Sequence, residues 1–201
     1  MSKKAINQNS NHISELLNSM RSKFIFDENP INRLKNTKYN SKESESVKKI
    51  DKIAELNQLK EHINSISDCD LKNNAKNIVL GDGNINSPIM LIGETPGIEE
   101  NKTGTTFKGE IGELLNKMLL AIKIKRQKIY CSYAINFRPP EDRKPTSQEI
   151  KRYSVFLKEH ISIINPKIIV LMGSSAMEAV TGINSKISSE RGKWKEIILN
   201  N

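Results

Sequence analysis

The sequence predicts an α/β fold, a three-layer αβα sandwich around a central parallel sheet. Short apolar runs bounded by proline, glycine or polar residues are typical of buried strands, and three occur at residues 89–92, 128–134 and 167–172. Helical patterns of ten or more residues lie between these runs. Strands that alternate with such helices form parallel sheets through βαβ crossovers. Ligands of such sheets bind outside the carboxyl ends of the strands.

The 201 residues divide into three expected parts. Residues 1–46 are rich in Ser, Asn and Lys, and we expect a mobile polar extension in which 13–24 has one apolar helical face. Residues 47–66 have apolar residues at steps of three and four, which predicts an amphipathic helix. This helix either docks on the domain or binds a partner, and docking is favoured. Residues 67–201 are expected to form the α/β domain.

Within that domain the elements follow one another in a regular order. A strand is expected at 78–80 with a turn at 81–84, and a helix is expected at 109–122 after the first buried strand. Thr146 and Glu149 have the spacing of a capping box, directly after a proline, which predicts that a helix starts there. That helix should end at residues 165–166, and Ser174 should cap a short helix after the last strand.

The charge of the chain indicates the kind of partner, and its cysteine content indicates the compartment. Lys and Arg number 32 against 23 Asp and Glu, for a net charge of +9. This surplus favours nucleic acid over an anionic membrane surface, although the Lys, Asn and Ile content also fits an AT-rich genome. The sequence contains no apolar run long enough for a transmembrane helix and no readable secretory signal. Cys69 and Cys131 are too few for a disulfide framework, so the expected compartment is the cytoplasm.

Two loops at the predicted ligand edge contain candidate site residues. Residues 93–104 form a glycine-rich loop in which Glu94 would bind a ligand donor or polarise a water, unless the segment is only a tight turn. Residues 136–146 are stiffened by three prolines and contain Arg138, Arg143 and Lys144. Such a rigid basic loop suits contact with a phosphate backbone, or it is an ordinary solvated connection.

Several motifs in one order resemble the uracil-DNA glycosylase superfamily, specifically its family-4 type. The resemblance runs from about Cys69 to Trp194. The motifs are Gly93-Glu94-Thr95-Pro96-Gly97, the Thr-Gly-x-x-Phe-x-Gly at 103–109, the Arg-Pro-Pro loop at 138–140, the Asn-Pro-Lys before the last strand and the Arg-Gly-x-Trp at 191–194.

The resemblance implies a fold, a reaction and a set of site residues. The family folds as a four-stranded parallel αβα sandwich and removes uracil from DNA after flipping the base out of the stack. Glu94 and Thr95 match the motif beside the flipped nucleotide, and Phe107 matches the aromatic residue that stacks on uracil, unless it is only a core residue. By the same resemblance the remaining residues bind substrate (Gly93, Gly97 and Tyr133) or DNA (Arg138, Pro139, Arg143, Lys144 and Arg191).

Three departures from the family pattern alter the expected activity. Tyr133 stands where the family places an asparagine that reads the base edge, and a phenol cannot offer the paired donor and acceptor of an amide. The family's last strand and His-Pro-Ser-like motif are expected to be missing after Trp194, so the domain is expected to be truncated. Cys69 matches the first ligand of the family's four-iron cluster, but Lys72 and Tyr153 stand at later ligand positions. We therefore expect no iron–sulfur cluster and no other metal.

We therefore expect a uracil-DNA glycosylase-like protein that binds uracil-containing DNA and hydrolyses the N-glycosidic bond weakly or not at all. The alternative is a catalytically inactive DNA-binding relic of a truncated gene. A third reading is a βαβ domain that binds a different nucleotide. The oligomeric state and the role of residues 1–66 stay open.

Overall fold

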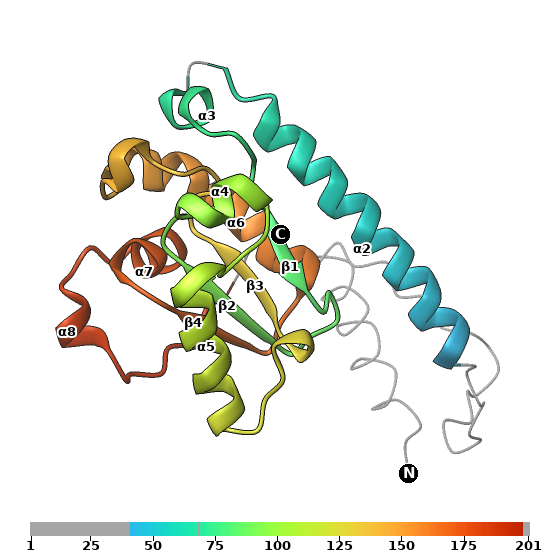
Figure 1. Ribbon diagram of the computed structural model, residues 1–201. Coiled ribbons are helices and arrows are strands. Elements are labelled where there is room, and N and C mark those ends of the chain that lie inside the picture. The colour runs from blue at the N-terminus through green and yellow to red at the C-terminus, as the bar shows by residue number, and fades with distance from the viewer. Residues whose placement is uncertain (1–40, 68, 199–201) are drawn as a thin grey trace, which may run out of the picture. The chain divides into compact units, whose positions relative to one another are not determined.

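The computed structural model describes residues 41–67 and 69–198. Its centre is a four-stranded sheet in the order β1-β3-β2-β4, with helices on both faces (Figure 1). Strand β2 pairs in parallel with β3 and β4, and β1 pairs antiparallel with β3. The predicted αβα architecture is confirmed. The strands are β1 (Gly81–Gly83), β2 (Ile89–Gly93), β3 (Tyr130–Tyr133) and β4 (Ile168–Leu171).

Helices and short turns connect and flank these strands. They are α2 (Ser41–Asn64), α3 (Asp70–Asn74), α4 (Ile98–Thr103), α5 (Gly109–Ala121), α6 (Ser147–Ile164), α7 (Ser174–Thr181) and α8 (Ile187–Glu190), with 3-10 turns η1 (Arg126–Lys128) and η2 (Pro140–Asp142). None of the helices in the described ranges is long and apolar enough to cross a membrane.

The sheet separates two hydrophobic cores. Successive side chains of a strand point to opposite faces, so Met90 and Ile92 of β2 enter one core while Leu91 enters the other. The larger core contains side chains of α2, α6 and α7, among them Leu59 and Tyr153. The smaller core lies beneath α5. Helix α5 therefore covers the face of the sheet opposite to α6.

Helix α6 begins and ends as its sequence predicts. The Thr146 hydroxyl accepts from the Glu149 N–H at 3.2 Å, and the Thr146 N–H donates to the Glu149 carboxylate at 2.7 Å. This reciprocal capping box satisfies N–H groups at the start of the helix. Asn165 ends the helix in a left-handed conformation, with φ 53°.

The strand expected at 78–80 is wrong, because the pairing segment is the predicted turn itself. Gly81–Gly83 form β1, and a Cβ added at Gly81 would lie 2.7 Å from the Tyr130 hydroxyl. Only glycine permits this close approach to β3. The Val79 N–H instead donates to the Asn136 carbonyl at 2.8 Å. Backbone proximity rather than β propensity determines where this strand forms.

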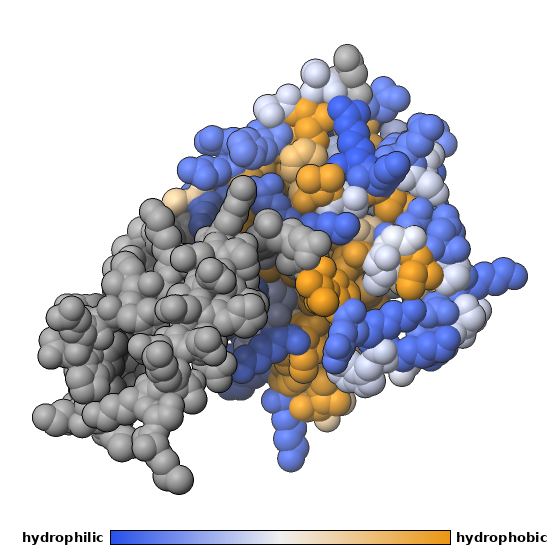
Figure 2. Space-filling view, turned by 180° about the vertical axis from the view of Figure 1, so that it is seen from behind, coloured by the Kyte–Doolittle hydropathy of each residue, from blue (hydrophilic) through white to orange (hydrophobic). Residues whose placement is uncertain are grey.

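Helix α5 is confirmed, but only some of its apolar residues are buried. Leu115 and Leu119 lie in the smaller core, whereas Leu114 and Met118 are 59% and 61% exposed. On the same face of the sheet, Val170 of β4 is 40% exposed. Figure 2 shows that hydrophobic side chains also reach the surface on the opposite side of the molecule, between hydrophilic ones.

Helix α2 packs along α6 and begins at Ser41, earlier than the sequence suggests. Leu56, Leu59 and Ile63 enter the larger core, and the Lys52 ammonium donates to the Ile164 carbonyl at 2.8 Å. The division expected at residue 46 falls inside this helix. The apolar helical face expected within residues 13–24 lies outside the described residues.

Candidate functional site

A cavity of about 660 Å³ lies at the carboxyl ends of the parallel strands. Its volume is within the range of small-molecule sites. The glycine-rich loop after β2 forms one wall, and Met172 after β4 contributes to another. Six predicted site residues line it together: Gly93, Glu94, Thr95, Gly97, Phe107 and Tyr133. The topology therefore brings these residues to the sheet edge where ligands are expected.

Glu94 links the loop after β2 to the helix after β4. Its carboxylate accepts from the Ser175 N–H at 2.9 Å and from the Ser174 hydroxyl at 3.2 Å. A negative charge at the N-terminus of α7 is favourable because the N–H groups there lack helical partners. Gly173 makes the approach possible, since a Cβ there would lie 2.4 Å from the Glu94 side chain. The Glu94 side chain thus has a fixed position beside the cavity.

Glu100 is a site residue that the sequence reasoning missed. Its side chain is buried, and its carboxylate accepts from the N–H groups of Gly97 at 3.0 Å and Lys108 at 2.9 Å. It also accepts from the Tyr133 hydroxyl at 3.3 Å. One carboxylate therefore joins both ends of the loop to β3. The glutamate three residues after Gly97, at the spacing of a helix-capping pair, was the available signal.

Phe107 and Tyr133 form an aromatic pair inside the cavity. Their ring centroids are 5.0 Å apart with an interplanar angle of 35°. The Phe107 N–H donates to the Tyr133 hydroxyl at 3.0 Å. Burial raises the pKa of the Tyr133 phenol well above its usual range, so the hydroxyl keeps its proton at neutral pH. The pair makes an aromatic wall with no charge of its own.

The far side of the loop is anchored to the strand edge by a polar cluster. The Thr106 N–H donates to the Asp82 carboxylate at 2.6 Å, and Arg126 bonds both Asp82 and, at 2.8 Å, the Thr106 hydroxyl. The Asn101 amide oxygen accepts from the Lys76 N–H at 2.8 Å. The loop is therefore held at several points along its length, as a preorganised site requires.

The predicted DNA-contacting residues lie outside this cavity, and two of them are paired within the chain. Arg138 donates to both carboxylate oxygens of Asp142 at 2.7 Å, and Arg143 donates to Glu149 at 2.6 Å and 2.9 Å. The Arg138 guanidinium holds the pKa of Asp142 below its usual value, and Arg143 lowers the pKa of Glu149 to about 2. These arginines therefore brace the basic loop.

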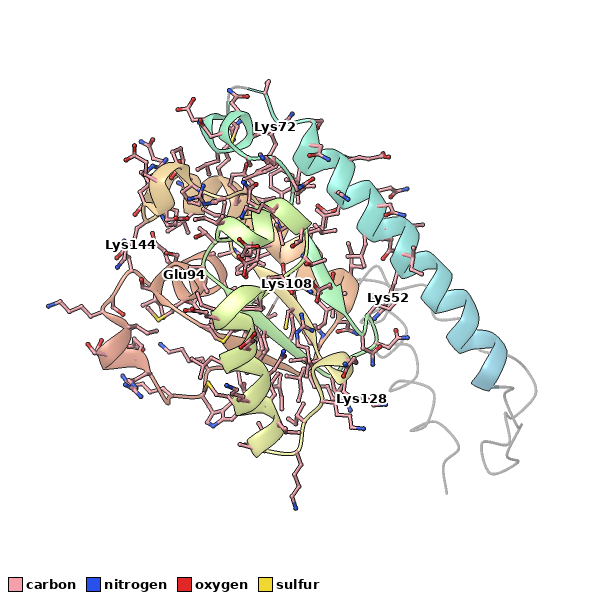
Figure 3. All side chains as sticks on the ribbon, viewed as in Figure 1. Lys52, Lys72, Glu94, Lys108, Lys128 and Lys144 are labelled. Carbon is pink, nitrogen blue, oxygen red and sulfur yellow. The ribbon has the colours of Figure 1, made fainter. Side chains whose placement is uncertain are left out.

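The other predicted contacts differ in accessibility. Pro139 is buried, whereas Lys144 and Arg191 are exposed. Lys144 lines a second cavity together with Ser174, whose hydroxyl contacts Glu94. Figure 3 shows Lys144 and Lys108 on either side of Glu94, while Lys128 lies at the other end of the sheet. Lys144 is thus the predicted cation best placed beside the site.

The residues at the expected iron positions do not fit a cluster. The Cys69 thiol and the Tyr153 hydroxyl are buried 3.2 Å apart, and the Lys72 ammonium donates to the carbonyls of Asn64 and, at 3.4 Å, Ile66. Cys131 belongs to the core on the other face of the sheet. Four thiolates are usual for such a cluster. Across residues 41–67 and 69–198, no three His, Cys, Asp or Glu side chains form a metal-binding group.

His160 takes part in a buried hydrogen-bond network rather than in the site. Its Nε2 lies 2.9 Å from the Tyr130 hydroxyl and its Nδ1 lies 3.3 Å from the Ser132 hydroxyl. Burial lowers its pKa to about 3, so the ring is neutral at physiological pH. The network joins α6 to the middle of β3 and has a structural role.

Comparison with known proteins shows a consistent similarity. The profile of the uracil DNA glycosylase superfamily matches residues 80–199. A type-4 uracil-DNA glycosylase of Thermotoga maritima is 38% identical over 133 residues, which cover 66% of this chain and 69% of the relative. Type-4 enzymes of Sulfurisphaera tokodaii and Archaeoglobus fulgidus are 36% and 32% identical, covering 70% and 71% of this chain and 67% and 73% of theirs.

Proposed function

Because the chain belongs to the uracil DNA glycosylase superfamily, we propose that it binds uracil-containing DNA at the carboxyl edge of its sheet and hydrolyses the N-glycosidic bond slowly. The single observation that carries the proposal is the cavity in which the loop from Gly93 to Gly97 faces Phe107. A flipped base is recognised by its face and its edge. Phe107, Glu94 and Thr95 line this cavity together, and we propose that Phe107 contacts the face of the base while Glu94 and Thr95 lie beside the sugar and the attacking water.

The slow rate follows from the base-reading position. Tyr133 uses its hydroxyl within the chain, towards Phe107 and Glu100. The Asn136 amide is equally engaged, because it donates to the Val79 carbonyl at 3.0 Å. The Tyr133 phenol thus offers the uracil edge no free donor, so we expect weak base recognition and a slow reaction. Tyr133 is also the observation that favours the second candidate, a DNA-binding protein without hydrolytic activity.

One assay separates these two candidates. Oligonucleotides with a single uracil, single- and double-stranded, are incubated with the protein and then treated with alkali, which breaks the strand at abasic sites. We expect slow cleavage at the uracil position and none at cytosine. No cleavage by a protein that binds DNA would favour the second candidate. Rapid cleavage, at rates typical of an efficient enzyme, would contradict the proposed slow chemistry.

DNA binding is tested by its salt dependence with two lysine variants. Lys144→Ala removes a cation beside the site, and Lys128→Ala removes one at the opposite end of the sheet (Figure 3). Each phosphate contact contributes about 0.9 to the slope of log affinity against log salt concentration. We expect Lys144→Ala to lower that slope by about this amount and Lys128→Ala to leave it unchanged. Binding that does not respond to salt would contradict a DNA-binding function.

We further propose that the protein functions without an iron–sulfur cluster. Two contacts support this: the Cys69 thiol pairs with the Tyr153 hydroxyl, and the Lys72 ammonium donates to the Ile66 carbonyl after α2. Iron and acid-labile sulfide are measured in protein purified under anaerobic conditions. Stoichiometric iron and sulfide would contradict the proposal.

A further inference from the structure

The ring of Tyr133 lies against the aromatic face that a flipped base would need. Tyr133 is 4% exposed, and its ring is tilted against that of Phe107 with centroids 5.0 Å apart. Both rings line the cavity that contains Glu94. A Cβ added at Gly93 would lie 2.7 Å from the Tyr133 ring and 3.1 Å from that of Phe107, so the backbone of β2 closes the other side. The stacking place is therefore filled by the chain itself.

The Tyr133 hydroxyl is held from two sides. It accepts from the Phe107 N–H at 3.0 Å and donates to the Glu100 carboxylate at 3.3 Å. A phenol has one donor hydrogen, so no donor is left for a ligand. Glu100 in turn is fixed by the N–H groups of Gly97 and Lys108. The ring thus has a defined position and does not merely fill space.

The Phe107 backbone is equally constrained. Phe107 has a positive φ of 50°, which is uncommon for a residue with a side chain and is often found at functional sites. Its carbonyl oxygen lies 1.9 Å from the place of a Cβ at Gly112, so the start of α5 packs directly on it. The Phe107 N–H donates to the Tyr133 oxygen, so it is a donor that an oxygen on a planar ring accepts.

We infer that Tyr133 is an internal occupant of the base-binding place, with its ring against Phe107 and its oxygen on the Phe107 N–H. A planar six-membered ring with an exocyclic oxygen is the ligand chemistry that this arrangement accepts, and a pyrimidine base shares it. Tyr133 therefore determines specificity: a base enters only when the phenol leaves. The inference rests on the proposed function only in taking the natural ligand to be a base in DNA.

Free ligands test the inference without DNA. Uracil and p-cresol, the latter equivalent to the tyrosine side chain, are titrated into wild type, Tyr133→Phe and Tyr133→Ala by calorimetry and ligand-observed NMR. A site that is open about 1% of the time binds about 100-fold more weakly than an open one. We expect Tyr133→Ala to bind both ligands and to exceed the affinity of wild type by this order. Tyr133→Phe keeps the ring but loses both hydrogen bonds of the hydroxyl, so its affinity should lie between those of wild type and Tyr133→Ala.

Three results would overturn the inference. Wild type that binds uracil as tightly as Tyr133→Ala would overturn it, and so would a folded alanine variant, checked by circular dichroism, that binds neither ligand. Equal binding by the phenylalanine and alanine variants would have the same consequence.

A second measurement needs only the wild-type chain, in case the variants do not fold. A 2-aminopurine beside uracil fluoresces when the uracil leaves the stack. We expect no increase when wild type binds this DNA, and a clear increase would overturn the inference. The free-ligand titration decides the role of Tyr133 even where DNA binding, and with it the proposed function, fails.

Discussion

Replacing Glu100 by alanine should substantially lower the free energy of unfolding. The substitution leaves the N–H groups of Gly97 and Lys108 and the hydroxyl of Tyr133 without their acceptor. The Tyr133 hydroxyl is buried, and a buried group that loses its only acceptor costs about 1–3 kcal/mol. The two N–H groups belong to half-buried Gly97 and exposed Lys108, so water can partly replace the carboxylate there. The three groups together give a loss on the order of 2–4 kcal/mol. Glu100→Gln keeps one acceptor oxygen and should lose about half as much.

Urea denaturation followed by circular dichroism measures these changes, and the adjacent Glu99 offers a matched control. Its side chain is 51% exposed and forms a surface ion pair with Lys102 at 2.8 Å. Exposed ion pairs contribute about 0–1 kcal/mol, so Glu99→Ala should be close to wild type. A Glu100→Ala variant that loses no more stability than Glu99→Ala would refute the assignment of Glu100 as the central support of the loop.

Three further predictions concern the stability of the fold. His160 has its pKa lowered to about 3, so between pH 6.5 and 3 the unfolded chain takes up a proton that the native state refuses. The free energy of unfolding should therefore decrease as the pH is lowered through that window, by up to about 1.4 kcal/mol per pH unit. His160→Gln should lessen this dependence in urea titrations at several pH values. Thr146→Ala removes the α6 cap and should cost about 1 kcal/mol in the same assay, whereas unchanged stability would contradict the cap's contribution. Leu115→Ala should cost about 2–5 kcal/mol and its exposed neighbour Met118→Ala less than about 0.5, so equal losses would contradict the assigned burial.

Elements with a strong local signal could be predicted from the sequence, and those that depend on close approach could not. The apolar run of β2 between a proline and a glycine, and the capping box at Thr146, correspond to observed boundaries. The Gly-Asp-Gly sequence of strand β1 has low β propensity. It forms a strand because it lies close enough to β3 to pair with it. For α5, periodicity identifies the helix but not which of Leu114 and Leu115 is buried.

In the site, too, features with a local sequence pattern could be predicted, and features that depend on long-range contacts could not. The motif around Glu94 and the aromatic Phe107 could be placed at one sheet edge, because parallel strands present their carboxyl ends together. The pairing of Arg138 with Asp142 was not predicted, although the two residues have the i,i+4 spacing at which ion pairs form in helices. The contact between Tyr133 and Glu100 spans 33 residues, and no local pattern indicates it.

The exposed apolar residues of β4 and α5 should make the association of the protein in solution depend on temperature. Ile168 and Val170 of β4 are 38% and 40% exposed, and Leu114 and Met118 of α5 add to the apolar surface on that face. Hydrophobic association weakens on cooling and strengthens in sulfate or phosphate. Concentrated solutions should therefore stay dispersed best in the cold and at low concentrations of these salts, whereas warming should favour association through this face.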